Sequence, residues 1–324
     1  MQVSVWMWVA FTAAVVGLLV LDLTVFHRDA RVTSKKEAAV WSAFWVCLAL
    51  LFNLGIYFLY GKERALEFLA GYLIEKSLSV DNIFVFLLLF SYFSVPAIYR
   101  HRVLFWGILG ALVMRGVFIV VGAALLHHFH WVMYIFGAFL VFTGIRMLAK
   151  HEENTDPSHN PAIRLLRRFM PITKGYEGQH FLVRRGGQLF ATPLLVVLVA
   201  VETTDLVFAV DSIPAIFAVT DDPFIVYTSN IFAILGLRAL FFLIAGVLEL
   251  FAYLRYGLGF VLSFVGVKML LADIYKIPIG LSLGVIAGIL TISVVASLLF
   301  PPKQPQEAEP ATGGEEQLPA SGMK

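Results

Sequence analysis

The sequence predicts an all-α fold, a polytopic membrane helix bundle of about nine transmembrane helices with two inverted three-helix repeats. Three observations predict this fold. Hydrophobic residues make up 60% of the 324 residues and charged residues 14%, whereas an ordinary soluble domain carries about 25% charged residues. The apolar residues form blocks of about 20, the length that crosses about 30 Å of hydrocarbon. The third observation is an internal repeat, which is described below.

Nine candidate spans follow one another along the chain. They lie at 3–26, 39–60, 66–92, 103–126, 131–149, 189–219, 225–250, 257–274 and 277–300. The first block lacks the basic start and the small-residue cleavage site of a signal peptide, so we expect it to be a retained span. Residues 1–300 are therefore predicted to form one transmembrane domain. Residues 301–324 have almost nothing apolar to bury, and we expect a disordered cytoplasmic tail there.

The charged loops predict which side of the membrane each end of the chain faces. Basic residues gather in the loops that follow the first, third, fifth and seventh spans: Arg28, Arg31, Lys35, Lys36, Arg100, Arg102, Lys150, Arg164, Arg167, Arg168, Lys174, Arg184, Arg185 and Arg255. Asp221 and Asp222 fall on the opposite side, with Lys62 and Arg64 as exceptions. Because cytoplasmic loops carry an excess of lysine and arginine, the N-terminus is expected outside and the C-terminus inside. The net charge of only +2 does not indicate nucleic-acid binding.

An internal repeat relates two halves of the chain. Residues 129–149 align without gaps to 251–271, Val80–Ile83 pairs with Val210–Ile213, and Arg115 pairs with Arg238. Each copy holds three spans, repeat one at 66–149 and repeat two at 189–274, with a cytoplasmic loop at 150–188 between them. An odd number of spans places the two copies in opposite orientations. Inverted repeats are typical of secondary transporters, although a duplication could also have enlarged the bundle without such a role.

Charged side chains lie well inside the predicted spans. They are the carboxylates Glu75, Asp81, Glu202, Asp205 and Asp211 and the cations Lys76, Arg115 and Arg238. Each charge costs about 2.5–3.5 kcal/mol at the centre of a span, so the set would cost on the order of 20 kcal/mol if it faced lipid. We therefore expect these groups to face inward and to pair. Structural or gating ion pairs account for the three cations, while the two excess carboxylates match one divalent cation.

The spacing of the acids limits how they can share an ion. Glu75 and Asp81 are six residues apart, as are Asp205 and Asp211. On an unbroken helix six residues rise about 9 Å and rotate about 120°, which is too far for one ion to bridge. Either the helix opens between the acids, or each acid pairs with a residue of the other repeat. Pro214 favours a broken or kinked helix just after Asp211.

The sequence thus predicts one shared metal site. Its expected ligands are the carboxylates Glu75, Asp81, Asp205 and Asp211 and the neutral oxygens of Ser79, Asn82, Thr204 and Ser212. Such oxygen ligands suit Mg²⁺, Ca²⁺ or Mn²⁺ and do not choose among them. The single cysteine, Cys47, makes thiol-based metal capture unexpected. In an alternative interpretation some of these carboxylates carry protons instead of metal.

Several stretches resemble the TerC family, and within it the Alx-like branch of bacterial inner-membrane proteins. They are GYLIEKSLSVDNIFVF at 71–86, LLFSYFSVP at 88–96, IFGAFLVFTGIRML at 135–148 and FAVDSIPAIFAVTDDPFIVYTSNIFAILGLRALFF at 208–242. The resemblance covers nearly all of residues 1–300. It implies an inner-membrane protein of a family named for tellurium resistance, with an activity in metal-ion export. In an inner membrane, the orientation predicted by the loop charges gives a periplasmic N-terminus and a cytoplasmic C-terminus.

The resemblance also implies a substrate and site residues. Mn²⁺ efflux is the activity associated with Alx-like members, so Mn²⁺ is expected as transported substrate and no resident cofactor is expected. Glu75, Asp81, Asp205 and Asp211 match the two acidic motifs, and Glu202 lies in the second motif. The lipid bilayer and a divalent ion are the expected partners, and no enzyme activity is expected.

Two alternatives come from other classes of protein. Asp81 and Asp211 could form an intramembrane aspartyl protease, but the Gly-x-Gly-Asp motif of such enzymes is absent, because Phe208, Ala209 and Val210 precede Asp211. The chain could also be a membrane scaffold for a metal or tellurite stress-response complex.

Overall fold

The computed structural model describes residues 4–21, 34–129, 131–149, 160–245 and 253–299. Eleven helices and one hairpin lie in these ranges. The helices are α1 (Val5–Leu21), α2 (Lys35–Tyr60), α3 (Lys62–Tyr92), α4 (Ala97–His128), α5 (Val132–Ala149), α6 (Pro161–Phe169), α7 (Pro193–Phe217), α8 (Pro223–Leu235), α9 (Leu237–Ile244), α10 (Leu254–Leu270) and α11 (Ile279–Leu299). The strands β1 (Leu182–Arg185) and β2 (Gln188–Ala191) pair antiparallel. The predicted all-α class is confirmed, and the predicted tail lies outside the described residues.

The helix ends follow local sequence signals. The Ser34 hydroxyl accepts a hydrogen bond from the Glu37 amide and begins α2. The Asp222 carboxylate accepts from the amides of Phe224 and Ile225 and begins α8. Proline occupies the first turn of α7, where its missing N–H removes no helical hydrogen bond. These local signals fix where α2, α7 and α8 begin.

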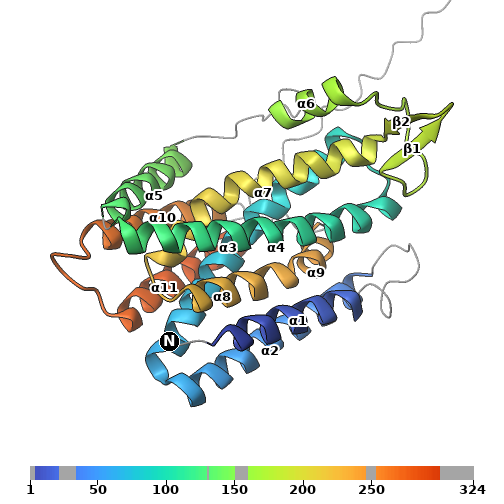
Figure 1. Cartoon of the computed structure of the whole chain (residues 1–324). Coiled ribbons are helices and arrows are strands. Elements are labelled where there is room, and N and C mark those ends of the chain that lie inside the picture. Colours follow the sequence, from blue (N-terminus) through green and yellow to red (C-terminus); the bar gives the residue numbers. More distant parts are fainter. Residues whose placement is uncertain (1–3, 22–33, 130, 150–159, 246–252, 300–324) are drawn as a thin grey trace, which may run out of the picture.

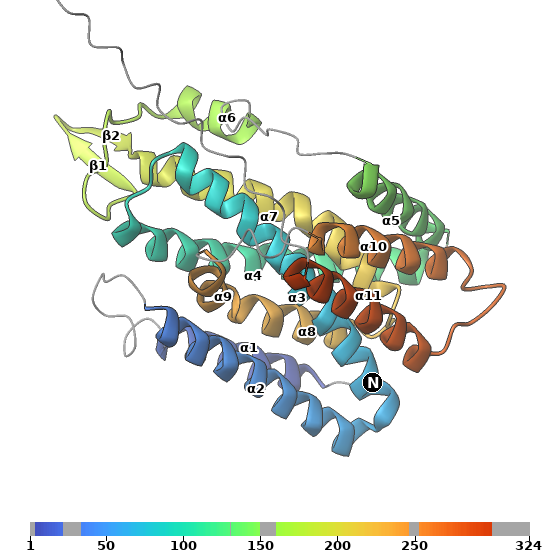
Figure 2. The same ribbon diagram turned by 180° about the vertical axis from the view of Figure 1, so that it is seen from behind.

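In the part of the chain that the structure describes, each predicted span overlaps a helix or the pair α8–α9, although strand β2 occupies the start of the span predicted at 189–219. Within the described residues, α2, α4, α5, α7 and α11 are long and apolar enough to cross a membrane, and the bent pair α8–α9 makes a sixth candidate. In Figures 1 and 2, α1 and α2 lie side by side along one border of the bundle, and α6 and the hairpin lie at the other. The count of nine spans stays a prediction.

The core divides into two main clusters. The larger cluster joins α1, α2, α3, α4, α7, α8 and α9, with the rings of Phe11, Phe52, Phe68 and Phe232 packed against one another. The second joins α10 and α11 to parts of α3 and α5. The polar centre described below lies among α3, α4, α7 and α8, within the larger group of helices.

Helices α5 and α10 pack backbone against backbone. A Cβ atom added to Gly137 would lie 3.1 Å from the carbonyl oxygen of Gly266, and one added to Gly144 would lie 2.6 Å from that of Gly259. Gly137 corresponds to Gly259 in the sequence repeat, and Gly144 to Gly266. Each glycine therefore faces the counterpart of the other, the reciprocal pattern of a two-fold interface. An inverted repeat predicts reciprocal glycine contacts between α5 and α10. For the other helices of the two copies, the inverted repeat stays a prediction.

The expected break at Pro214 is wrong. Helix α7 runs without interruption from Pro193 to Phe217, with Pro214 inside it. Pro214 lies in the last turn, so its missing N–H removes only one of the final hydrogen bonds, and Ala218 still donates to its carbonyl at 3.0 Å. The break lies instead in the predicted span 225–250, where α8 and α9 meet at Gly236 with a bend of 40°.

The predicted cytoplasmic loop 150–188 holds ordered elements. Helix α6 lies against α7, and the hairpin β1–β2 leads directly into α7. The Tyr176 hydroxyl donates to the carbonyl of Phe93 at the end of α3 at 2.7 Å. The Arg102 guanidinium stacks over the ring of Phe181, 5.4 Å from its centre. The described part of this segment, residues 160–188, therefore contacts the end of α3 and the beginning of α4.

Candidate functional site: an arginine between two buried carboxylates

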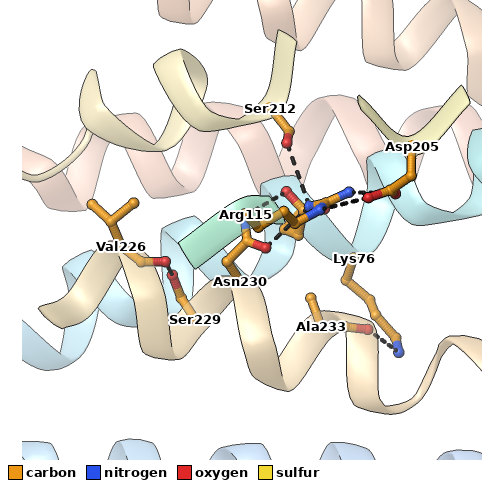
Figure 3. A network of polar contacts seen from close by, with 9 residues as sticks. Lys76, Arg115, Asp205, Ser212, Val226, Ser229, Asn230 and Ala233 are labelled. Atoms are coloured by element: carbon orange, nitrogen blue, oxygen red, sulfur yellow. Dashed lines mark hydrogen bonds and ion pairs between the residues drawn. The ribbon is translucent and has the colours of Figure 1, made fainter. Parts of the chain in front are cut away.

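Arg115 of α4 is the centre of the polar interior, and its side chain is fully buried. It forms an ion pair with Glu75 of α3 through Nη1. Its Nε and Nη2 donate to the two carboxylate oxygens of Asp205 on α7, at 3.2 Å and 2.9 Å. Figure 3 shows the guanidinium directed at Asp205, with Ser212 and Asn230 close by. One arginine from repeat one thus binds an acid of each repeat.

Neutral side chains of repeat two complete the cluster. The Asn230 amide oxygen of α8 accepts from Arg115 Nη1 at 3.0 Å, and its nitrogen donates to Glu75 Oε2 at 3.2 Å. The Ser212 hydroxyl of α7 accepts from Arg115 at 3.5 Å. Buried charges persist only when they are paired and hydrogen-bonded, and this cluster meets that condition. With both carboxylates ionised, one negative charge remains on the cluster.

A stripe of oxygen donors continues from Glu75 along α3. Ser79 and Asn82 follow at four and seven residues, which places all three side chains on one face of the unbroken helix. Both residues are buried, at 1% exposure, and Ser79 Oγ and Asn82 Oδ1 have no hydrogen-bond partner among the described residues. Leaving such an atom unsatisfied costs about 1–3 kcal/mol. Asp81 lies between them in α3, and its side chain is outside the described set.

The remaining predicted ligands lie on α7. The Asp211 carboxylate accepts from the Thr143 hydroxyl of α5 at 3.3 Å, and Arg146 of α5 adds a favourable charge interaction. The Thr204 hydroxyl donates to the Ala200 carbonyl of its own helix at 2.8 Å. Glu202 has no hydrogen bond or ion pair to any described residue. A Cβ at Gly110 of α4 would come within 2.0 Å of its carboxylate, so Glu202 fills the space that this glycine leaves.

Lys76 binds the broken span. Its ammonium donates to the carbonyl of Ala233 at 3.3 Å, in the last turn of α8 (Figure 3). A Cβ at Gly236 would lie 2.7 Å from Lys76 Nζ and 3.2 Å from Trp45 Cβ, so glycine is the residue that leaves room for this approach. A carbonyl at the C-terminal end of α8 therefore binds a cationic group, the ammonium of Lys76 on α3. Arg238, the repeat counterpart of Arg115, is buried on α9.

A charged cavity opens at the end of the bundle where α3 begins and α7 ends. Its volume is about 710 Å³, and its charged lining comprises Glu63, Arg64, Glu67, Asp221, Asp222, Lys268 and Lys276. The Glu67 carboxylate accepts from Thr220 at 2.6 Å and from Arg64 at 2.8 Å, which joins α3 to the turn between α7 and α8. Glu67 lies eight residues before Glu75, about 12 Å along α3. This end is the one predicted to face outward.

The structure brings together part of the predicted site. Glu75, Asp205 and Ser212 meet at Arg115, whereas the Asp211 carboxylate is directed to Thr143 on α5. Among the described side chains, no three His, Cys, Asp or Glu residues form a ready-made metal cluster. From the sequence, Asn230 is expected to form a hydrogen bond between helices but not to belong to the site, and Thr143 is not predicted at all. Asn230 had a signal, since it follows Thr228 and Ser229 inside an apolar block, while nothing in the sequence marks Thr143.

Comparisons with known proteins agree with this architecture. The model of the integral membrane protein TerC family matches residues 60–305. An "Uncharacterized membrane protein STKORF319" of Myxococcus xanthus is 54% identical over 90% of this chain and 92% of its own length. A "Putative membrane-bound redox modulator Alx" of Salmonella typhi is 53% identical over 89% of this chain and 92% of its own.

A more distant relative covers the same part of the chain. The "Uncharacterized membrane protein" of Rickettsia felis is 42% identical over 90% of this chain and 97% of its own length. No solved structure matches. The family match covers the helices that hold the arginine-centred cluster, α3, α4, α7 and α8. The chain therefore belongs to the TerC family of integral membrane proteins.

Proposed function

We propose that this TerC-family protein exports a divalent metal cation by alternating access, with Mn²⁺ as the leading substrate and Ca²⁺ and Mg²⁺ as alternatives. One observation carries the proposal. Ser79 and Asn82 present buried oxygens without partners on either side of Asp81, on the same face of α3 as Glu75. A hard cation satisfies such oxygens and offsets the cost of burying them.

Arg115 supplies a mechanism for release. It binds Glu75 and Asp205, which are two of the proposed ligands. A divalent cation and the guanidinium compete for the same carboxylates, because two positive groups at one site repel each other. In the proposed cycle the ion displaces Arg115 on binding from the cytoplasm, and the return of Arg115 to both acids expels the ion outward. Proton entry onto emptied carboxylates would complete the coupling.

The first test measures transport by the acid variants. Asp81→Asn and Asp211→Asn are expected to abolish manganese tolerance of cells at unchanged protein level, because each removes one ligand charge. In inside-out vesicles, uptake of Mn²⁺, Ca²⁺, Mg²⁺ and Zn²⁺ with and without a pH gradient identifies the ion and the coupling. Wild-type tolerance and uptake in both variants would end this proposal.

The second test separates ligand oxygens from structural ones. Ser79→Ala removes a hydroxyl that has no described partner, so protein stability is expected to hold or rise slightly while Mn²⁺ uptake falls several-fold. Ser77→Ala is the matched control, because the Ser77 hydroxyl donates to the Leu73 carbonyl of its own helix at 2.7 Å. Equal uptake by the two variants would contradict a ligand role for Ser79.

The name of the Salmonella relative suggests a redox role as the second candidate. The chain has a single cysteine, Cys47 on the exposed side of α2, so one copy cannot form an internal disulfide. A redox role would then have to proceed without a thiol pair in the chain. The test is the variant Cys47→Ser in cells. If manganese tolerance and thiol balance are both unchanged, the result favours transport over a redox role.

A further inference from the structure

Helix α6 has three faces with different chemistry. Its nine residues, PAIRLLRRF, begin at Asn160, whose side chain accepts from the Ala162 amide at 2.9 Å. Ile163 is buried to 1% exposure and Leu166 packs on the core, so this face fixes the helix to the bundle beside α7. The other two faces do not pack on the bundle.

The exposed part of α6 divides into an apolar flank and a basic flank. Leu165 and Phe169, four residues apart on one side, are 55% and 77% exposed. Arg164 and Arg168 lie on the adjoining side, displaced by about 100° around the axis, and Arg167 extends it. All three arginines are exposed, and none forms an ion pair or side-chain hydrogen bond with a residue that the structure describes.

We propose that α6 is a binding site for anionic phospholipid. The three arginines bind the phosphates of the headgroups, and Leu165 and Phe169 enter the boundary between headgroups and acyl chains. An apolar flank beside a basic flank is the pattern of helices that lie in a membrane interface. Nucleic acid or a soluble acidic protein would match the arginines but would leave Phe169 in water. The inference is independent of the transported ion.

The position of α6 agrees with this partner. Figures 1 and 2 show α6 at the border of the bundle next to α7, and away from α1 and α2. Because α7 is long and apolar enough to cross a membrane, a helix packed against its side is expected to lie within reach of surrounding lipid. Each basic residue near an anionic surface contributes about 1 kcal/mol, so three arginines favour anionic over zwitterionic lipid on the order of 100-fold.

The first experiment locates the apolar flank. Cys47→Ser removes the only cysteine, and Phe169→Cys then carries an environment-sensitive fluorophore on the full chain. In nanodiscs with phosphatidylglycerol we expect blue-shifted emission that nitroxide-labelled acyl chains quench. The same label at Arg184, exposed on the hairpin, is the control for a site in water. Emission at position 169 that matches the hairpin label would overturn the proposal.

The second experiment measures headgroup selectivity. Wild-type protein is expected to retain phosphatidylglycerol over phosphatidylcholine in native mass spectrometry, and the triple variant R164Q/R167Q/R168Q to lose this preference on the order of 100-fold. The triple lysine variant keeps the charge and should keep most of the preference, which controls for folding. Inorganic phosphate at equal concentration should not compete. Equal retention of both lipids by wild type, or full competition by phosphate, would contradict a lipid site.

Discussion

At the scale of single residues, the central feature is one guanidinium shared by two carboxylates from different repeats. The Arg115 side chain is fully enclosed, so none of its charge is screened by water. Removing one partner of such a group leaves buried charges without compensation, which costs about 3–5 kcal/mol. Replacing the whole group by neutral side chains of similar size costs far less.

This asymmetry makes a prediction. Arg115→Met should lower the free energy of unfolding by about 3–5 kcal/mol, because Glu75 and Asp205 then repel each other without a cation. The combination E75Q/R115M/D205N should recover most of that loss. Both expectations are checked by thermal unfolding in detergent, in which size-exclusion chromatography measures the protein that stays folded at each temperature. Lys174→Met, at an exposed lysine of the segment between α6 and β1, is the control and should change little.

The sequence predicted which residues of this cluster matter but not how they pair. Charged side chains inside apolar blocks are visible in the sequence, and Glu75, Asp205 and Arg115 were predicted in this way. The neutral Ser212 was predicted as an oxygen ligand next to Asp211. Pairing depends on which helix faces which, and spacing along one helix says nothing of that. The rotation between Glu75 and Asp81 did exclude a common ion on an unbroken helix, and α3 is unbroken. Opening of the helix between the two acids is therefore excluded, and Glu75 contacts Arg115 of its own repeat and Asn230 of the other repeat.

At the scale of elements, the glycine contacts between α5 and α10 set the distance between two backbones. Lipid tails are as apolar as leucine, so membrane helices associate through close packing rather than through a hydrophobic gain. Gly144 is the tightest position, since an added Cβ would lie 2.3 Å from Ser263 Oγ and 2.6 Å from the Gly259 carbonyl oxygen. A side chain there must push the helices apart.

Gly144→Ala should therefore lower stability by roughly 1–3 kcal/mol, seen as a fall of several degrees in the melting temperature. Gly288→Ala on α11 is the matched control, because nothing lies within 4 Å of a Cβ built there. The control should hold or gain stability, since alanine favours helix over glycine. Equal melting temperatures for the two variants would show that the α5–α10 contact does not limit stability.

The element boundaries show where local signals fail. Proline at position 214 is a strong breaker in principle, yet it lies three residues before the end of α7, where the helix has few hydrogen bonds left to lose. The actual break at Gly236 follows an ordinary apolar run, and Lys76 of α3, far away in sequence, binds the carbonyl of Ala233 beside it. A window of neighbouring residues does not contain such a tertiary contact.

At the scale of the whole molecule, the orientation decides what the charged cavity does. Loop charges predict that Asp221 faces outward and that the hairpin faces the cytoplasm. With Cys47→Ser as background, Asp221→Cys should react with a membrane-impermeant maleimide in intact cells. Arg184→Cys on the hairpin should react only after permeabilisation. The opposite result would show that the predicted orientation is reversed. The charged cavity would then face the cytoplasm, the side from which the proposed exporter takes up its ion.

The contact between Lys76 and Ala233 has a consequence for the proposed transport cycle, in which the protein returns without its ion. A helix interrupted in hydrocarbon exposes a carbonyl dipole, and that dipole normally depends on water or on a transported ion for solvation. Here a lysine of the same chain binds one such carbonyl. In the proposed cycle the bend at Gly236 would therefore need no bound ion to solvate this carbonyl, and the span would not have to straighten each time the ion leaves.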